Sequence, residues 1–128
     1  MISRSPPTIV VVDDDPDIVE FLCDYLPGMN CGVVSCCPGP QAAACIAKHV
    51  PSLVILDVEM GDTTGIDLFL AMRADATTRQ VPVIFFTANP DKLRHALPHY
   101  HTLDAALVVK PDIAGLGARI RDIVHHHA

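Results

Sequence analysis

Each of four short apolar runs in this sequence is followed at once by a polar residue whose side chain can do chemistry. These residues are Asp13, Asp57, Thr87 and Lys110. If the runs are parallel strands, their carboxyl ends share one edge of a sheet, and open α/β sheets bind ligands there. A single polar residue after a strand is usually a turn former or a helix cap. The joint occurrence is more specific, and it predicts one crevice that gathers carboxylates, a hydroxyl and an ammonium group.

Asp14 and Asp15 extend the first of these positions to a run of consecutive carboxylates. Asp15 is interpreted as a helix cap, because the Pro16 that follows it favours the first turn of a helix. Asp13 and Asp14 are not needed as caps, and carboxylates that cluster beside a third one repel each other unless a cation is present. Hard oxygen ligands with open water positions suit Mg²⁺. The residues alone therefore predict a magnesium site formed by Asp13, Asp14 and Asp57.

The apolar runs are β-branched or aliphatic and do not alternate with polar residues, which is typical of strands buried on both faces of a parallel sheet. The strong runs span 9–12, 53–56, 81–86 and 105–109, and a weaker one spans 31–36. A helical pattern follows each run, with expected starts at Pro16, about Gln41, Thr64, Asn89-Pro90 and Asp112. Repeated βα units with short connections predict right-handed crossovers and a three-layer α/β sandwich.

The 128 residues are enough for a single domain over 1–128. The net charge of −6 argues against a nucleic-acid surface. No apolar run approaches the ~20 residues of a membrane helix, and residues 1–7 lack the apolar stretch of a signal peptide. The 5 cysteines are odd in number and form no C-x-x-C pair. They are therefore expected to be reduced, core-filling residues of a cytoplasmic protein.

A set of motifs resembles the receiver domains of two-component response regulators. In chain order they are VVDDDP at 11–16, PSLVILDVEM at 51–60, Gly65, FTA at 86–88 and VKP at 109–111. Each motif is weak alone, but their order and spacing are specific, and the likeness covers a core from about Thr8 to Val124. The resemblance implies a flavodoxin-like (βα)5 fold, with a five-stranded parallel sheet in the order 2-1-3-4-5.

The resemblance also implies a chemistry. Asp57 would be the phosphoacceptor and take a phosphoryl group from a sensor histidine kinase or a histidine phosphotransfer protein. Mg²⁺ would be held by Asp13, Asp14, Asp57 and the backbone carbonyl of Glu59. Lys110, followed by a cis-proline peptide, would pair with a phosphoryl oxygen. The domain would be a signalling switch that phosphorylates and dephosphorylates itself, not a classical enzyme.

A readout of the phosphoryl group follows from the same resemblance. The Thr87 hydroxyl would turn to the new phosphoryl oxygen and shift a partner-binding face made by the fourth helix, fifth strand and fifth helix. This face is also the expected route to a homodimer. Its partner would be an output domain of a longer chain or a separate protein, with no direct contact to nucleic acid or membrane. Glu59 and Asn89 occupy positions where the family tunes the lifetime of the phosphoryl group.

Several departures from the family concern this readout. Leu107 replaces the usual aromatic residue and is interpreted as a core-filling side chain, which puts an aromatic switch in doubt. Gly61 replaces a loop proline, which predicts a more mobile or differently shaped loop. Pro98 predicts a short or irregular fourth helix. The nearby histidines are expected to be solvated or packed, with a metal site as the alternative; they are His95, His99 and His101.

Other functions stay open as alternatives. One is a constitutive protein-interaction module that keeps the fold and is independent of phosphorylation. Leu107 and Gly61 favour it, whereas the intact polar residues of the site favour the switch; these are Asp13, Asp14, Asp57, Thr87 and Lys110. Another is a phosphatase of small phosphate esters with Asp57 as nucleophile and Glu59 as acid, although the chain is too short for the usual cap domain. The vicinal Cys36 and Cys37 are interpreted as core or turn residues, with a redox sensor as the less favoured reading.

Overall fold

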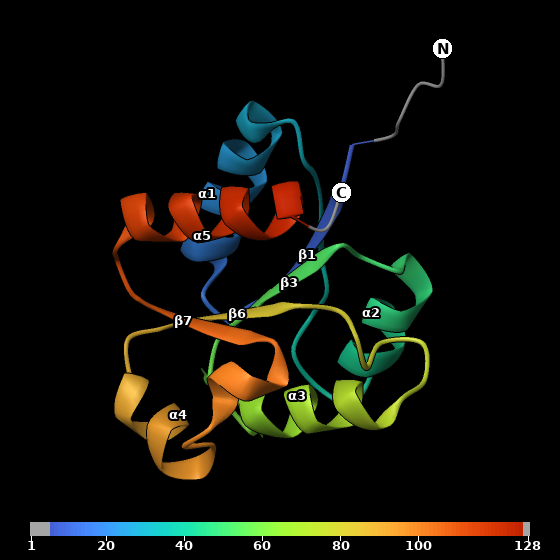
Figure 1. Ribbon diagram of the computed structural model, residues 1–128, viewed down its shortest axis with the longest axis vertical. Helices are drawn as coiled ribbons and strands as arrows, with labels where there is room; N and C mark the ends of the chain where they lie inside the picture. The colour runs from blue at the N-terminus through green and yellow to red at the C-terminus, as the bar shows by residue number, and fades with distance from the viewer. Residues whose placement is uncertain (1–5, 127–128) are drawn as a thin grey trace.

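The computed structural model describes residues 6–126. A five-stranded parallel sheet forms its centre, in the order β2-β1-β3-β6-β7 (Figure 1). The strands are β1 Thr8–Val12, β2 Gly32–Ser35, β3 Leu53–Leu56, β6 Val83–Thr87 and β7 Ala105–Val109. This is the predicted order 2-1-3-4-5, because β4 and β5 form a separate small hairpin, so the predicted fold class is confirmed. Residues 1–5 and 127–128, which the single-domain and signal-peptide expectations include, lie outside the described residues.

Helices cover both faces of the sheet (Figure 1). One face carries α1 Pro16–Tyr25 and α5 Ile113–His126, and the other carries α2 Ala42–His49, α3 Gly65–Ala74 and α4 Pro90–Ala96. In β1, Ile9 and Val11 pack into the layer of α1 and α5, whereas Val10 and Val12 pack into the layer of α2 and α3. Both layers exclude water, which explains why the apolar runs do not alternate. None of the helices in the described part of the chain is both long and apolar enough to cross a membrane.

The predicted helix starts are set by local capping bonds. The side chains of Asp15, Thr64, Asn89 and Asp112 each accept a hydrogen bond from a backbone N–H of the turn that follows. Such a cap satisfies an amide that has no partner inside the helix. At the other end, α1 continues into the 3-10 helix η1 Leu26–Met29. The fourth helix is short, as Pro98 predicts, and the chain then forms the 3-10 helix η2 Tyr100–Leu103.

The expectation that all cysteines are reduced was wrong for two of them. Cys36, which follows β2, forms a disulfide with Cys45 of α2. The pair is separated by 9 residues in sequence, so no C-x-x-C motif announces it. Cys23, Cys31 and Cys37 are free, with Cys31 buried and Cys37 exposed. The vicinal cysteines thus have different environments, because only the first is cross-linked.

Arg73 ties the end of α3 to the segment that leads into β7. Its guanidinium donates hydrogen bonds to the carbonyl oxygens of Leu103 at 3.0 Å, Asp104 at 3.2 Å and Thr78 at 3.4 Å. Its Cζ also lies 4.6 Å from the centroid of the Phe69 ring. A planar guanidinium can meet several carbonyls at once, so one side chain fixes two loops relative to a helix.

Candidate functional site

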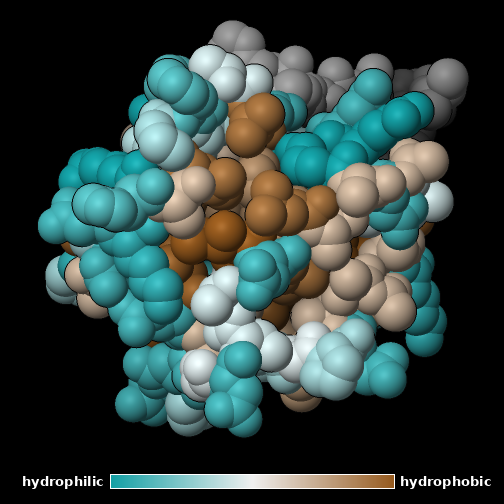
Figure 2. Space-filling model, turned by 90° about the horizontal axis from the view of Figure 1, so that it is seen from below, coloured by the Kyte–Doolittle hydropathy of each residue, from teal (hydrophilic) through white to brown (hydrophobic). Residues whose placement is uncertain are grey.

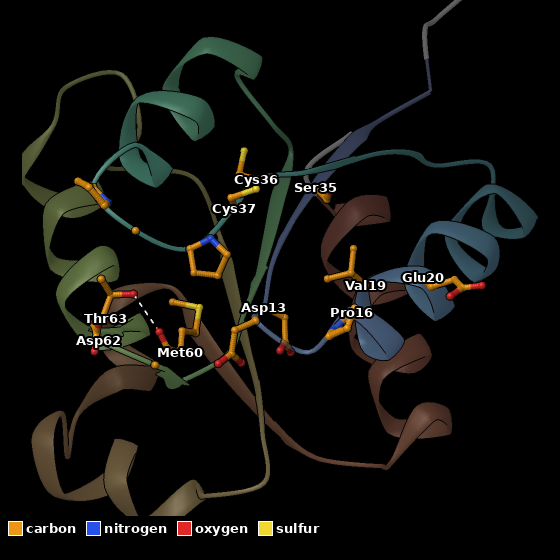
Figure 3. A pocket seen from close by; sticks show the side chains of 15 residues that line it. Asp13, Pro16, Val19, Glu20, Ser35, Cys36, Cys37, Met60, Asp62 and Thr63 are labelled. Atoms are coloured by element: carbon orange, nitrogen blue, oxygen red, sulfur yellow. Dashed lines mark hydrogen bonds between the residues drawn. The ribbon is translucent and has the colours of Figure 1, made fainter.

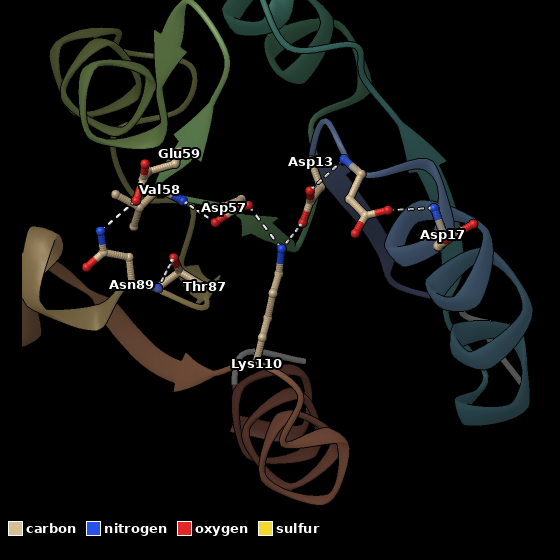
Figure 4. A network of polar contacts seen from close by, with 9 residues as sticks. Asp13, Asp17, Asp57, Val58, Glu59, Thr87, Asn89 and Lys110 are labelled. Atoms are coloured by element: carbon tan, nitrogen blue, oxygen red, sulfur yellow. Dashed lines mark hydrogen bonds and ion pairs between the residues drawn. The ribbon is translucent and has the colours of Figure 1, made fainter.

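The polar residues singled out in the sequence lie together at the carboxyl edge of the sheet (Figure 4). Asp13 follows β1, Asp57 follows β3 and Lys110 follows β7. Thr87 is the last residue of β6 and pairs with Val109, so it ends the strand and does not follow it as expected. One ligand oxygen from each of the aspartates at 13, 14 and 57 lies within 4.8 Å of the others. The structure therefore brings carboxylates, a hydroxyl and an ammonium group into one small region.

Lys110 extends from the end of β7 to lie between two of the carboxylates (Figure 4). Its Nζ is 2.9 Å from Asp13 Oδ2 and 3.0 Å from Asp57 Oδ2. Burial by itself would lower the pKa of Lys110, but hydrogen bonds and charge attraction from both aspartates outweigh it and raise the pKa. Burial raises the pKa of Asp13, although the bond from Lys110 opposes this change. The ammonium group is thus held in its charged form and offsets part of the negative charge of the site.

Asp57 is fixed by backbone contacts on both sides. Its N–H donates to Val12 O at 3.1 Å, which extends the pairing of β1 with β3 beyond the strands. Its Oδ1 accepts a bond from Val58 N at 2.7 Å, which leaves Oδ2 to face Lys110. A Cβ on Gly65 would overlap the carbonyl oxygen of Asp57. Only glycine therefore lets α3 begin so close to the end of β3.

Thr87 and two flanking residues form a second network beside Asp57 (Figure 4). The buried Thr87 Oγ1 accepts a hydrogen bond from Asn89 N at 3.0 Å. Asn89 Nδ2 in turn donates to Glu59 Oε1 at 2.6 Å. Glu59 and Asn89 are the residues predicted to modulate the site, and their 30-residue separation hides this contact from sequence reasoning. The bond joins the loop after β3 to the loop after β6.

The loop after Asp57 has a defined and unusual shape. Glu59–Met60 forms β4 and Thr63–Thr64 forms β5, and the two pair as an antiparallel hairpin. Gly61 lies in the turn with a backbone φ of 66°, a value that residues other than glycine rarely adopt. The sequence predicted a more mobile or differently shaped loop, and the structure shows a different shape.

Two further expectations concern residues around the fourth helix. Leu107 is partly buried and packs against the core layer that includes α2, α3 and α4, which agrees with its reading as a core-filling side chain. Within residues 6–126, only the aspartates at 13, 14 and 57 form a group of three or more potential metal ligands. The rings of His99 and His101 meet edge to face with centroids 6.4 Å apart. The histidines therefore pack or face solvent, as the favoured reading predicts.

A cavity of about 770 Å³ opens beside the carboxylates (Figure 3). Its walls come from the loop after β1, the first turns of α1, the loop after β2 and the β4–β5 hairpin. The lining includes Asp13, Asp14, Glu20 and Asp62 but no lysine or arginine. Cys36 lines it from the β2 side. Sequence reasoning found the carboxylates but not this neighbour, because only the crossover between β1 and β2 places the cysteine near them.

Comparison with known sequences decides the family. The profile of the response regulator receiver domain matches residues 9–111. The chain belongs to the response regulator receiver domain family. Among curated relatives, the DNA-binding response regulator MtrA of Mycolicibacterium smegmatis is 36% identical over 83 residues, which are 65% of this chain and 35% of the relative. Response regulator PleD of Caulobacter vibrioides is 35% identical over 80 residues, which are 62% of this chain and 18% of PleD.

Solved structures show the same fold. A sensor protein from Polaromonas sp. JS666 superposes with a TM-score of 0.82 at 22% identity, covering 95% of this chain and 98% of that one. The BeF3-activated receiver domain of Klebsiella pneumoniae RstA gives a TM-score of 0.77 at 28% identity, covering 91% and 97%. The receiver domain spans about a third or less of the length of the curated relatives it matches. In this receiver domain the polar cluster lies at the switch point of the strand order, between β1 and β3. The loops that follow these two strands lead to helices on opposite faces of the sheet.

Proposed function

We propose that this receiver domain accepts a phosphoryl group on Asp57 from a phosphohistidine of a sensor histidine kinase or a histidine phosphotransfer protein. The observation that carries the proposal is the Asp57 carboxylate, held within 4.8 Å of two other carboxylates and with Oδ2 at 3.0 Å from Lys110 Nζ. Negative charge on the carboxylate and on the phosphoryl group opposes their approach, so positive groups at this place favour the reaction. Family membership makes a histidine kinase the expected donor.

The donor set fits Mg²⁺. Asp13, Asp14 and Asp57 offer hard oxygen ligands in one small space, and the exposure of Asp14 leaves room for water ligands. The backbone carbonyl of Glu59 would complete the protein ligands. Bound there, Mg²⁺ would offset the negative charge that gathers between the carboxylates and the phosphoryl group. Lys110, which lies between two of the carboxylates, would not hold the metal but would pair with a phosphoryl oxygen.

Thr87 is the proposed link from the phosphoryl group to a partner. Among the described bonds its Oγ1 only accepts, so its hydroxyl hydrogen can be donated to a phosphoryl oxygen on Asp57. A turn of this hydroxyl would also disturb Asn89, which caps α4. Large apolar side chains are exposed in the segment that follows α4: Leu103 on η2 and Val109 on β7.

The proposed partner surface is the face of α4, β7 and α5. Figure 2 shows a different face, the outer side of α2, α3 and α4, where apolar side chains gather at the centre of the view and polar ones frame them. On the proposed face itself, Val109 of β7 is an exposed large apolar side chain, and exposed apolar surface can mark a protein-binding face. The occupant would be an output segment, a separate protein or a second copy of the receiver.

The receiver domain itself is proposed to make no direct contact with nucleic acid. MtrA is named a DNA-binding response regulator, but the matched region is 35% of its length. In a longer protein this receiver would regulate an output segment of that kind, and as a separate protein it would bind its partner directly.

Beryllofluoride, which mimics a phosphoryl group on a carboxylate, tests the proposal. We expect the wild type to bind it in the presence of Mg²⁺ and to take up one phosphoryl group from acetyl phosphate, as measured by intact mass. Asp57→Asn should abolish both. Asp62→Asn is the matched control, because it removes a carboxylate from the same cavity but not from the end of β3. If the wild type binds neither reagent, or if Asp57→Asn binds equally well, the proposal is wrong.

Amide hydrogen exchange separates a switch from a constitutive binder. A switch should change the exchange of α4 and β7 when beryllofluoride binds. Unchanged exchange on both elements, with beryllofluoride bound, would support the constitutive module instead.

A further inference from the structure

One half of a disulfide, Cys36, lies in the wall of the cavity beside the carboxylates (Figure 3). Cys36 lines this cavity together with Asp13 and Asp14, and its sulfur is bonded to Cys45 of α2. Cys36 is 3% exposed, whereas Cys45 is partly exposed. Cys45 is therefore the more exposed end of the cross-link. Neither cysteine takes part in the hydrogen-bond network around Asp57.

The loop that the disulfide closes has few other ties. The backbone N–H of Cys36 donates to Val11 O at 3.0 Å and anchors only the start of the loop. Ala42 N donates to Gly39 O at 3.1 Å, which is a bond within the loop region itself. In the described part of the chain, no hydrogen bond joins residues 37–41 to another strand or loop. The covalent bond is therefore the principal restraint on this wall of the cavity.

The helix at the far end of the loop has unfavourable caps. Helix α2 has 8 residues, and its N-cap Gln41 makes no side-chain capping bond. Its first turn contains no acidic residue that would favour the helix dipole. Its C-cap is Val50 with a φ of 44°, a conformation that β-branched residues rarely adopt. Capping bonds therefore do not fix the N-terminal end of α2, and the cross-link at Cys45 ties the helix to the end of β2.

The loop also faces the hairpin that follows Asp57. Gly39 and Pro40 share a smaller cavity of about 310 Å³ with Met60 of the hairpin. Met60 is buried and lines both this cavity and the larger one. Met60 thus borders both the loop and the larger cavity. Because the hairpin starts at Glu59, two residues after Asp57, a displacement of the loop that moves Met60 also affects the segment that holds Asp57.

We propose that Cys36 and Cys45 form a redox modification site, at which a dithiol reductant opens the disulfide and loosens the cavity wall beside the carboxylates. One thiolate of the dithiol attacks the sulfur of Cys45, which breaks the disulfide and releases Cys36 as a thiolate that takes up a proton. The second thiol of the reductant displaces Cys45, which also takes up a proton. The dithiol is oxidised to its disulfide, and the protein gains two thiols with two electrons and two protons.

Opening the bond frees residues 37–41 and weakens the packing of the hairpin. The ligand oxygens beside the cavity then lose a fixed geometry, so the reduced protein binds Mg²⁺ with beryllofluoride more weakly. We expect a decrease of at least about fivefold, as is typical for coupling between two sites. This last consequence rests on the proposed function, whereas the loosening of the loop does not.

Thiol alkylation under denaturing conditions and amide hydrogen exchange test the site in the full chain. After mild oxidation, three thiols should react, because Cys23, Cys31 and Cys37 are free, and a peptide pair joined through Cys36 and Cys45 should be found. After treatment with dithiothreitol, all 5 cysteines should react. Reduction should also speed exchange in residues 59–64 and at the amides of Cys36, Ala42 and Cys45, which donate hydrogen bonds at the two ends of the loop. Equal exchange in both redox states, or no cross-linked peptide after oxidation, would overturn the proposal.

Two variants separate the disulfide from general effects of reductant. Cys45→Ser should show the fast exchange and weak beryllofluoride binding of the reduced protein, with or without reductant. Cys37→Ser is the matched control, because it removes an exposed thiol beside the bond and should respond to reductant as the wild type does. A Cys45→Ser protein that behaves like the oxidised wild type would contradict the proposal. If Cys45→Ser does not fold, the oxidised and reduced wild type still decide.

Beryllofluoride binding tests the proposed function, and amide exchange tests the role of the disulfide, so either proposal can be wrong without the other. If neither redox form binds beryllofluoride, the proposed phosphoacceptor function is wrong, and the exchange rates still decide whether the disulfide controls the loop.

Discussion

Replacing Gly65 with alanine tests how closely β3 and α3 must approach to position Asp57. Gly65 is the first residue of α3, and its N–H donates to Val58 O at 2.8 Å. A Cβ at this place would overlap the carbonyl oxygen of Asp57, lie 2.9 Å from its carbonyl carbon and lie 3.1 Å from Leu56 Cγ. Two of these atoms are backbone, so they cannot avoid the methyl group by changing a rotamer.

The expected cost follows from the displacement. Carbon and oxygen atoms that are not bonded stay at least about 3.3 Å apart, so α3 and the end of β3 must separate by more than about 1 Å. Forcing an extra methyl group into a packed site costs about 1–3 kcal/mol, and rigid backbone neighbours favour the upper end. Alanine would gain at most about 1 kcal/mol over glycine through helix propensity. The net loss of unfolding free energy should be about 2 kcal/mol, or roughly 8 °C in Tm.

Urea denaturation and beryllofluoride binding measure the two consequences. Gly65→Ala should lower the urea midpoint and weaken beryllofluoride binding at least about tenfold, because a 1 Å shift of the reacting group is costly. Gly28→Ala is the matched control: a Cβ there meets nothing within 4 Å, so stability should change by less than about 0.5 kcal/mol. If both variants unfold at the same midpoint and bind beryllofluoride equally, the close approach of α3 to Asp57 does not matter as argued.

Other changes test separate parts of the molecule. Arg73→Ala should lower the unfolding free energy measured in urea by about 3 kcal/mol, because it removes charge-assisted bonds to several carbonyls. Arg79 is exposed, so Arg79→Ala should cost less than about 0.5 kcal/mol. Equal losses would show that the Arg73 bonds do not stabilise the fold. Asp14→Asn should raise Tm by a few degrees without Mg²⁺, since it reduces carboxylate repulsion, and it should remove the further rise that MgCl₂ gives the wild type; a retained rise would place the metal elsewhere. Lys110→Met should lower stability by about 2 kcal/mol near pH 8. Because the pKa of Lys110 is raised in the folded protein, its contribution to stability is complete below its ordinary pKa of 10.5 and is lost as the pH rises through the folded value. The unfolding free energies of the wild type and Lys110→Met should therefore converge above that folded value. A difference that stays constant with pH would contradict the ion pairs.

Much of the fold could be read from local patterns. The run Leu53–Leu56 could be located to the residue, because a short run of β-branched and aliphatic residues without alternation is typical of a strand buried between two layers. Asp15 and Thr64 were identified as caps because the bond from a capping side chain reaches only the next turn. The gathering of Asp13 and Asp57 at one edge followed from strand direction alone.

Contacts between distant segments could not be read in this way. The bond between Glu59 and Asn89 joins loops 30 residues apart, and neither residue type announces a partner. Thr87 was expected just after its strand, but pairing with Val109 extends β6 by one residue, and only the neighbouring strand decides this. Such details depend on register and crossover geometry, which local sequence does not specify.

The sequence by itself determined which residue types stand at the strand ends, and with them the fold class and the receiver family. Tertiary structure decided how those groups meet. Lys110 lies between Asp13 and Asp57 because β7 ends beside β6 at the same edge. Cys36 meets Cys45 because β2 brings the residue that follows it beside α2, and not because of their spacing. Local propensity acts over a few residues, whereas ion pairs and cross-links form only after the sheet order has brought distant segments together.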